Sequence, residues 1–355
     1  MGYSQVPHSP LAGFMPILGV YGVSVMVAFF GVLLALSFSH FRQKTRLQAY
    51  VPITLVSLLT LGAVLKTVAW ASPVGKPLSV ALLQGNIAQN LKWSPETAQT
   101  TISTYLNMMQ ASDAQLIVMP ETALPIIYSE LAPYVKDALV AKAKQVQGDV
   151  VVGMIEQAPQ TDDYYNSAIG FNDAGVQSYR KNHLVPFGEF IPFKAVFGWI
   201  YRDWLNMPLS DLSRGGAHQP LMLTKQQQKL GVNVCYEDVF GEEIIRQLPE
   251  ATLLVNISND AWYGESFAAV QHMQFSQARA LETGREVLRA TNTGATAHIN
   301  RQGYVLAHAP HDIQTTLTVQ AQGHKGITPY VMWGNWPFVV FSFAVIAFVL
   351  RRKNK

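Results

Sequence analysis

The sequence predicts an α/β domain attached to membrane-spanning helices, and three observations support this fold class. Apolar β-type runs alternate with helix-like stretches between about residues 77 and 328, and long uncharged apolar runs lie near both ends of the chain. Hydrophobic residues make up 49% of the 355 residues and charged residues only 14%, which is more apolar than an ordinary soluble domain. The net charge of +3 is mild and forms no basic groove, so nucleic acid is not expected as a partner.

Residues 1–72 are predicted to form a membrane region with two spanning helices. Ile17–Phe38 is uncharged and long enough to cross the hydrocarbon core. No Lys or Arg precedes this run, so the basic region of a cleaved signal peptide is missing. A basic loop at 42–46 leads to the second run, Tyr50–Trp70, near whose end Lys66 can extend toward the headgroups.

A third apolar segment, Trp333–Leu350, begins with tryptophans and ends at a basic tail, residues 351–355. Aromatic residues at one end and basic residues at the other define an oriented spanning helix. Because positive charge marks the cytoplasmic side, the 42–46 loop and the tail are both predicted to lie inside. The block between Trp70 and Trp333 is then expected on the extracytoplasmic side.

This block, residues 77–328, has the length of one or at most two domains. The β-type runs are Leu78–Leu83, Leu116–Met119, Val150–Val152, Ser167–Phe171, Leu230–Cys235, Leu253–Ile257 and Ala297–Asn300. The helix-like stretches are Pro95–Gln110, Leu131–Gln147 and Gln271–Arg289. Their alternation predicts sheets covered by helices.

Cys235 is the only cysteine in the chain. A lone cysteine forms no intramolecular disulfide, and one interpretation is a small buried core residue. The other follows from its neighbours, because the apolar run ends at Cys235 and polar Tyr236 and Glu237 follow at once. A thiol at the end of a strand is well placed to act as a nucleophile.

Two further polar sites follow predicted strands. Glu121 follows the run Leu116–Met119 after a single proline, and Lys181 lies in the basic cluster of Tyr179–Pro192. A solvated loop acid and a surface basic turn are the alternative interpretations, and His183 alone is typical of a structural histidine. Together, a carboxylate could take and return the thiol proton while an ammonium stabilises negative charge. No zinc or nucleotide pattern is present, so neither a metal nor a cofactor is predicted.

The segments around these residues resemble a known superfamily. MPETALP, RKNHLVPFGEFIP and GVNVCYED, in that order, look like the Glu-Lys-Cys signature of the nitrilase, or carbon–nitrogen hydrolase, superfamily, and LLVNISNDAWYG reinforces it. The similarity extends to the apolipoprotein N-acyltransferase family through GYSQVPHSPLAG, QGNIAQNLKW, QHMQFSQARALETGR, RATNTG and TPYVMWGNWP.

The resemblance implies a four-layer αββα domain in which Glu121 is the general base and acid, Lys181 the electrostatic stabiliser and Cys235 the nucleophile. It further implies that Glu189 supports Lys181. The residues that it implies shape the pocket or its entrance are Asn166, Trp93, Tyr236 and Glu237. The implied reaction moves an acyl chain from a phospholipid, such as phosphatidylethanolamine, through a cysteine thioester to the amine of a diacylglyceryl-cysteine on an apolipoprotein. The implied location is the bacterial inner membrane, with the catalytic domain on the periplasmic side.

Members of that family usually have eight membrane helices, whereas three are predicted in this sequence, as expected for an N-terminally incomplete or a shortened form. Two alternatives to the acyltransferase stay open. A membrane-anchored amidase or nitrilase would use the same three residues and let water resolve the thioester. A non-catalytic membrane scaffold would keep the fold without the reaction.

The segment Phe193–Leu212 is crowded with large apolar side chains. A core helix is one interpretation. Because the segment lies between two strands that carry site residues, and because Trp and Tyr favour the water–lipid boundary, we expect instead an amphipathic arm at the site's mouth. Phe197, Trp199 and Ile200 are its predicted lipid-binding residues.

Overall fold

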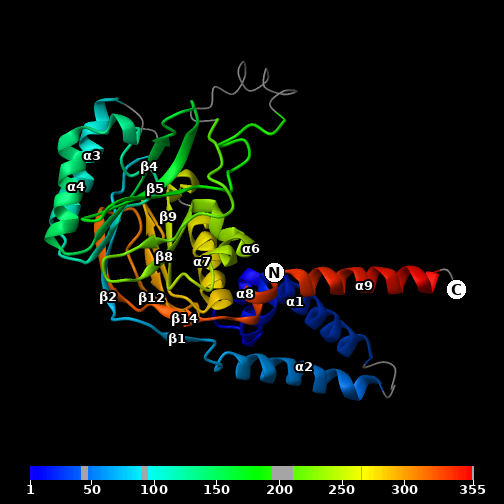
Figure 1. The fold of residues 1–355 in the computed structure, drawn as a ribbon. Helices are drawn as coiled ribbons and strands as arrows, with labels where there is room; N and C mark the ends of the chain where they lie inside the picture. The colour runs from blue at the N-terminus through cyan, green and yellow to red at the C-terminus, as the bar shows by residue number, and fades with distance from the viewer. Residues whose placement is uncertain (41–46, 89–94, 194–210, 265, 354–355) are drawn as a thin grey trace.

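The computed structural model describes residues 1–40, 47–88, 95–193, 211–264 and 266–353. Two six-stranded sheets pack face to face, and helices cover their outer faces (Figure 1). Three further helices at the two ends of the chain extend away from this sandwich. The four layers expected from the sequence are therefore present in the order helix, sheet, sheet, helix.

The first sheet has the strand order β13-β2-β3-β4-β5-β6, in which β2, β3 and β4 run parallel. Its strands are β2 (Leu78–Gln84), β3 (Leu116–Val118), β4 (Asp149–Gln157), β5 (Tyr164–Asn172), β6 (Gly175–Arg180) and β13 (Thr315–Ala321). Helices α3 (Pro95–Gln110) and α4 (Pro133–Gln145) cover its outer face, where Val150 and Val152 pack with Leu139. Val151 points to the opposite face, as the two-residue period of a strand requires.

The second sheet has the order β12-β11-β10-β9-β8-β7, with β8, β9 and β10 parallel. Its strands are β7 (Met222–Leu223), β8 (Lys229–Val234), β9 (Leu253–Ser258), β10 (Val287–Thr291), β11 (Ala297–Ile299) and β12 (Val305–His308). Helix α7 (Ala268–Thr283) covers its outer face. Val232, Val255 and Leu288 pack against the first sheet and form the core between the two sheets.

Shorter elements join these layers. β1 (Ala71–Pro73) pairs with β14 (His324–Gly326) beside the ends of the two sheets. The remaining short helices are η1 (Gly2–Gln5), η2 (Pro10–Phe14), η3 (Tyr128–Glu130), η4 (Cys235–Val239), α6 (Gly241–Ile244), η5 (Ile245–Gln247), η6 (Asp260–Tyr263) and α8 (Pro329–Trp333).

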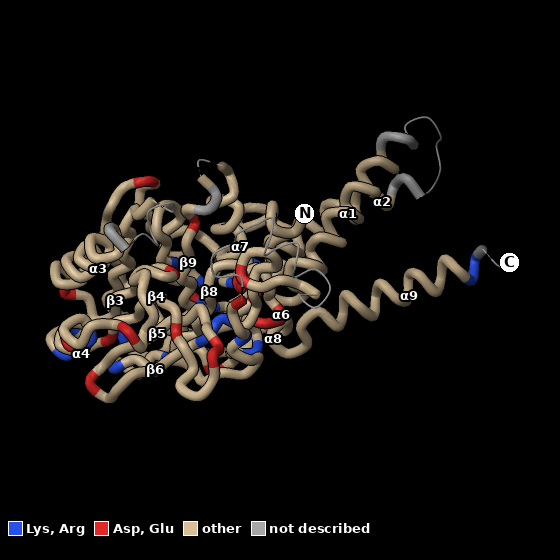
Figure 2. Tube along the Cα trace, turned by 90° about the horizontal axis from the view of Figure 1, so that it is seen from above, with Lys and Arg blue, Asp and Glu red and all other residues tan. Residues whose placement is uncertain are grey.

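The terminal helices α1 (Met15–His40), α2 (Leu47–Leu65) and α9 (Trp336–Lys353) extend on the same side of the sandwich. Figure 2 shows them almost free of charged residues up to the basic end of α9. By length and composition, the stretch Pro10–Ser37 can cross a membrane, and Tyr50–Leu65 is a shorter apolar helix. The predicted multi-pass topology remains a prediction.

The second apolar run is helical only as far as Leu65, and not to Trp70 as predicted. Lys66 follows the helix and donates a hydrogen bond from Nζ to the carbonyl of Pro7 at 2.6 Å. Its Nζ also reaches the hydroxyl of Tyr304 at 3.1 Å. Lys66 thus ties α2 to the N-terminal segment and to the α/β sandwich.

All seven predicted β-type runs coincide with strands, and Pro95–Gln110 is helical over its predicted range. The prediction of one helix over Gln271–Arg289 is wrong at its end. Gly284 adopts a left-handed conformation (φ 66°) that ends α7, and the segment Val287–Thr291 that follows forms β10. Cys235 itself belongs to η4 and not to the preceding strand.

Candidate active site

The structure brings Glu121, Lys181 and Cys235 together at one edge of the sandwich. Glu121 follows β3, Lys181 follows β6 directly, and Cys235 begins η4 at the end of β8. The Lys181 ammonium lies 3.6 Å from Oε1 of Glu121, and both charges act on the thiol of Cys235. The convergence expected at the strand ends is therefore present, while the catalytic roles stay predictions.

Glu121 is buried, which excludes the interpretation as a solvated loop acid. Its Oε1 accepts a hydrogen bond from Nδ2 of Asn166 at 2.7 Å, and its Oε2 accepts one from the backbone N–H of Asn259 at 2.9 Å. Gly153 on β4 makes room for this turn, because a Cβ there would lie 2.6 Å from Cα of Glu121. The carboxylate is thus fixed by strands of both sheets.

Lys181 is 1% exposed, so it is not part of a surface basic turn. Its Nζ lies 2.8 Å from Glu189, which also accepts from Nδ2 of Asn166 and from the N–H of Val185. Burial lowers the pKa of Lys181, but the carboxylates of Glu121 and Glu189 outweigh this effect and raise it above its usual range. Lys181 therefore stays a cation, and Glu189 and Asn166 hold it in place.

Cys235 is nearly buried and contacts the core between the sheets, as the core interpretation expects. Its backbone conformation and its charged neighbours do not fit an ordinary core cysteine. Its backbone has φ of 54°, a left-handed conformation that costs a non-glycine residue about 1–3 kcal/mol. Burial and the charge of Glu121 raise the pKa of the thiol, opposed by Lys181 and a hydrogen bond with Ser258. The resting group is a neutral thiol that needs a base.

Glu237 joins the turn after Cys235 to the segment after Lys181. Its carboxylate accepts hydrogen bonds from the backbone N–H groups of Val234 (2.7 Å), Asn182 (2.7 Å) and His183 (3.1 Å), and from the hydroxyl of Tyr179. Burial raises the pKa of Glu237 to about 7, although these backbone donors lower it. Glu237 therefore holds these two segments together.

We expect Glu237→Gln to lower the free energy of unfolding by about 1–3 kcal/mol, because the new NH₂ group must face one of these donors and leave it unpaired. Denaturant unfolding checks this value. Glu243→Gln on α6 is the control, since Glu243 is partly exposed and pairs with Nδ1 of His183 at 3.2 Å and with Arg246 at 3.8 Å in partly exposed contacts, and such pairs contribute little. Equal stability of the two variants would contradict the role assigned to Glu237.

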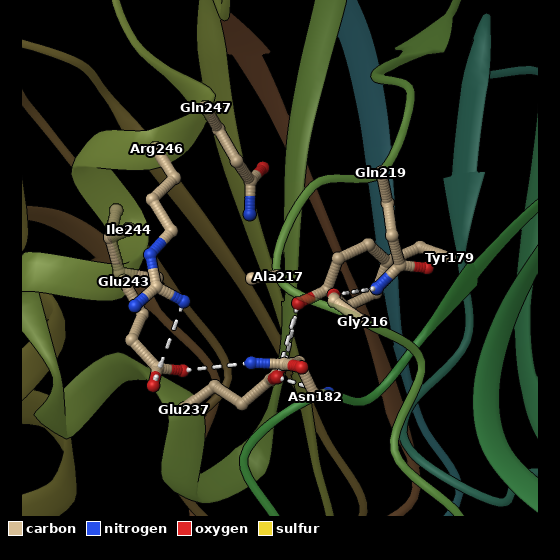
Figure 3. Close-up of a pocket in the computed structure, with 10 residues that line it drawn as sticks. All are labelled: Tyr179, Asn182, Gly216, Ala217, Gln219, Glu237, Glu243, Ile244, Arg246 and Gln247. Carbon is tan, nitrogen blue, oxygen red and sulfur yellow. Dashed lines mark hydrogen bonds and ion pairs between the residues drawn. The ribbon is translucent and has the colours of Figure 1, made fainter.

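A pocket adjoins Glu237 (Figure 3). Among the described residues, its lining includes Tyr179, Asn182, Glu237, Glu243 and Arg246 but neither Glu121, Lys181 nor Cys235. It is therefore a neighbour of the candidate site.

Tyr236 packs edge-on against Phe240, with ring centroids 5.1 Å apart, and Phe240 stacks on His183 at 3.7 Å. His183 also pairs through Nδ1 with Glu243 at 3.2 Å. These contacts agree with a structural role for His183. They place Tyr236 in an aromatic cluster next to Cys235 in the chain.

Trp93, Phe197, Trp199 and Ile200 lie outside the residues that the structure describes. The sequence reasoning missed Ser258 and the backbone N–H of Asn259, which contact the thiol and Glu121. Both lie at the end of β9, next to β8, inside the LLVNISNDAWYG segment. The parallel pairing of β8 and β9 was the signal that could have placed them at the site.

Comparison with known proteins agrees with this geometry. The sequence model for carbon–nitrogen hydrolases matches residues 79–325, which defines the class of the catalytic domain. The chain belongs to the apolipoprotein N-acyltransferase family. It is 50% identical to the apolipoprotein N-acyltransferase of Nitrosomonas europaea over 99% of this chain and 68% of that protein. It is 42% identical to that of Chromobacterium violaceum, over 98% of this chain and 67% of that protein.

Solved structures share the fold at low identity. A carbon–nitrogen hydrolase from Helicobacter pylori superposes with a TM-score of 0.52 at 18% identity, covering 69% of this chain and 89% of its own. An amidase from Nesterenkonia sp. superposes with a TM-score of 0.51 at 16% identity, covering 76% of this chain and 97% of its own. These likenesses establish the nitrilase-type α/β sandwich.

Proposed function

We propose that Cys235 takes an acyl chain from a phospholipid as a thioester and passes it to the N-terminal amine of a diacylglyceryl-cysteine on an apolipoprotein. As a member of its family the chain is an acyltransferase of the carbon–nitrogen hydrolase superfamily. The observation that carries the proposal is the buried contact of Glu121, Lys181 and a neutral thiol at the strand ends.

In the first half-reaction, Glu121 removes the proton from Cys235 as sulfur attacks the ester carbonyl carbon of the phospholipid. The carbonyl π electrons move to oxygen, and the Lys181 ammonium stabilises this oxyanion. When the tetrahedral intermediate collapses, the bond from carbon to the glycerol oxygen breaks. Protonated Glu121 gives its proton to that oxygen, and a lysophospholipid leaves behind a thioester.

In the second half-reaction, the free amine of the acceptor cysteine attacks the thioester carbon. Glu121, again a carboxylate, takes a proton from the attacking nitrogen. The carbon–sulfur bond then breaks, and sulfur recovers the proton from Glu121. The products are an amide-linked third chain and the resting thiol, so atoms and charges balance over the cycle.

The terminal helices support a place in the bacterial inner membrane. The apolar stretch Pro10–Ser37 can cross a bilayer, and the basic end of α9 favours a cytoplasmic C-terminus by the positive-inside rule. The catalytic domain would then lie on the periplasmic side. Phosphatidylethanolamine is the phospholipid that we propose as the donor.

The proposal is tested by incubating the full chain in membranes with phosphatidylethanolamine and a diacylated lipopeptide. Mass spectrometry should find the lipopeptide heavier by one acyl group, together with lysophosphatidylethanolamine. Free fatty acid without acylated lipopeptide would show instead that water resolves the thioester, as in an amidase. Absence of both products would favour a non-catalytic scaffold.

We expect Lys181→Met to reduce turnover by about 10²–10³-fold, because loss of one stabilising donor costs about 2.7–4 kcal/mol. It should also destabilise the fold, since Glu121 and Glu189 would keep buried charge without their cation. The variant Lys181→Met/Glu189→Gln removes one of these charges. It should regain stability but not turnover, measured per folded molecule. Wild-type turnover in either variant would refute the role of Lys181.

A further inference from the structure

The turn that carries the nucleophile is held from three directions. Its left-handed residue, Cys235, is strained, and such a conformation persists when its surroundings fix it. Glu237 holds the turn from the Lys181 side. The side chain of Asp238 accepts from Ser276 at 2.6 Å and pairs with Arg289 at 3.0 Å, both inside the domain. The third set of contacts leads to the membrane region.

This third set is centred on Arg279 of α7, which is 1% exposed. Its Nη1 donates to the backbone carbonyls of Asp238 at 3.2 Å and Val239 at 2.9 Å, at the end of the nucleophile turn. The hydroxyl of Tyr3, in the N-terminal segment, donates to the same Val239 carbonyl at 2.8 Å. The other terminal nitrogen, Nη2, lies 2.7 Å from Oε2 of Glu282. One guanidinium thus joins the turn to a buried carboxylate.

Glu282 in turn binds the long apolar helix α1. Gly19 interrupts this helix with a non-helical conformation (φ 63°, ψ −179°). The helix restarts at Val20, whose N–H has no helical partner at a new N-terminus. Oε1 of Glu282 accepts this N–H at 2.7 Å. A Cβ atom at Gly19 would lie 2.3 Å from Cε2 of the Tyr330 ring and would collide with it. The break is therefore packed tightly against α8.

We propose that Arg279 and Glu282 are positioning residues that hold the Cys235–Val239 turn in a fixed relation to the break in α1. The contacts run without a gap from the Val20 N–H through Glu282 and Arg279 to the carbonyls of the turn. The apolar helix thereby helps to set where the thiol points. This inference rests on the proposed role of Cys235 as the nucleophile.

A matched control exists on the same chain. Arg285 is also fully buried, and its guanidinium donates to the backbone carbonyls of Ala251 (2.6 Å), Pro249 (3.0 Å) and Gly326 (2.8 Å). None of these groups belongs to the nucleophile turn. Arg285→Met therefore removes at least as many buried hydrogen bonds as Arg279 makes, without touching the contacts to Asp238 and Val239.

The test measures the rate of acylation of Cys235 at saturating phosphatidylethanolamine, for the full chain in membranes and per folded molecule. Arg279→Lys keeps a cation for Glu282 but cannot span both carbonyls. We expect it to stay folded and bind phospholipid with unchanged KM, yet to react up to about a hundredfold more slowly, as small misplacements of reacting groups do. Arg285→Met should lose stability and keep its rate. A wild-type rate in Arg279→Lys, or an equal loss in Arg285→Met, would overturn the proposal.

The link to α1 predicts non-additive effects. Glu282→Gln keeps an oxygen for the Val20 N–H but loses the ion pair with Arg279. If the contacts act in series, Arg279→Lys/Glu282→Gln should react no more slowly than Arg279→Lys alone. Multiplied losses would show that the two residues act independently. The wild type is the reference in each assay. If the wild type forms no acyl group on Cys235, the proposed function fails. If the wild type is acylated and the variants react as fast as it does, only the positioning role is refuted.

Discussion

Cys235→Ala will form no acyl-enzyme, whereas the wild type, given phosphatidylethanolamine but no lipopeptide, will accumulate one acyl group on Cys235. The acyl group accumulates in the wild type because the first half-reaction can proceed to the thioester, while the amine needed for the second half-reaction is absent. Cys235→Ala lacks the thiol that would form this thioester. Intact-protein mass spectrometry gives the added mass, and release by hydroxylamine identifies a thioester. Because the chain has one cysteine, the label has a single possible thiol site.

Cys235→Ser is the matched control for this experiment. It keeps the size of the side chain and the hydrogen bond with Ser258, but a hydroxyl is a far weaker nucleophile than a thiol in this setting. We expect no hydroxylamine-labile acyl group on it and no turnover above background. An acyl group on another residue of the wild type, or turnover by Cys235→Ala, would contradict the covalent route.

The layers of the fold could be predicted because their elements have strong local signals. Runs such as Val150–Val152 are β-branched and apolar, and Pro95–Gln110 begins with a proline and carries no internal breaker. The end of α7 was misplaced, since Val287 and Leu288 of β10 follow soon after Gly284 and extend the apparent helical pattern past this glycine. Short strands such as β7, with two residues, give too little pattern to be recognised.

The candidate site could be predicted in its main residues but not in its environment. From residue types alone Glu121 and Lys181 could have been surface charges, and the resemblance to a superfamily signature favoured the site. Their burial depends on which strands become neighbours, and this is a property of the whole fold. The contact of Arg279 with Val239 was invisible for the same reason, because α7 and η4 meet only in three dimensions, whereas Glu282 lies one turn further along the same helix.

Glu121→Gln should slow acylation of Cys235 by about 10²–10⁴-fold, because an amide cannot take the thiol proton. The Asn259 N–H can still bind the remaining oxygen, but the new NH₂ group faces Nδ2 of Asn166, which also donates to Glu189. The variant should therefore lose some stability, and its rate is taken per folded molecule. Single-turnover measurement of the acyl-enzyme with excess phosphatidylethanolamine gives the rate.

The same variant should make the thiol more reactive toward a small neutral alkylating reagent at a given pH. The charge of Glu121 raises the pKa of Cys235, while Lys181 and Ser258 lower it. Glu121→Gln removes the charge of Glu121 and keeps Lys181 and Ser258, so the pKa of the thiol falls. The alkylation profile should therefore move to lower pH. Glu189→Gln is the control, because Glu189 contacts Lys181 and supports it without being the base. Opposite changes in acylation and alkylation identify a general base, whereas a parallel loss of both would mean that Glu121 only maintains the structure.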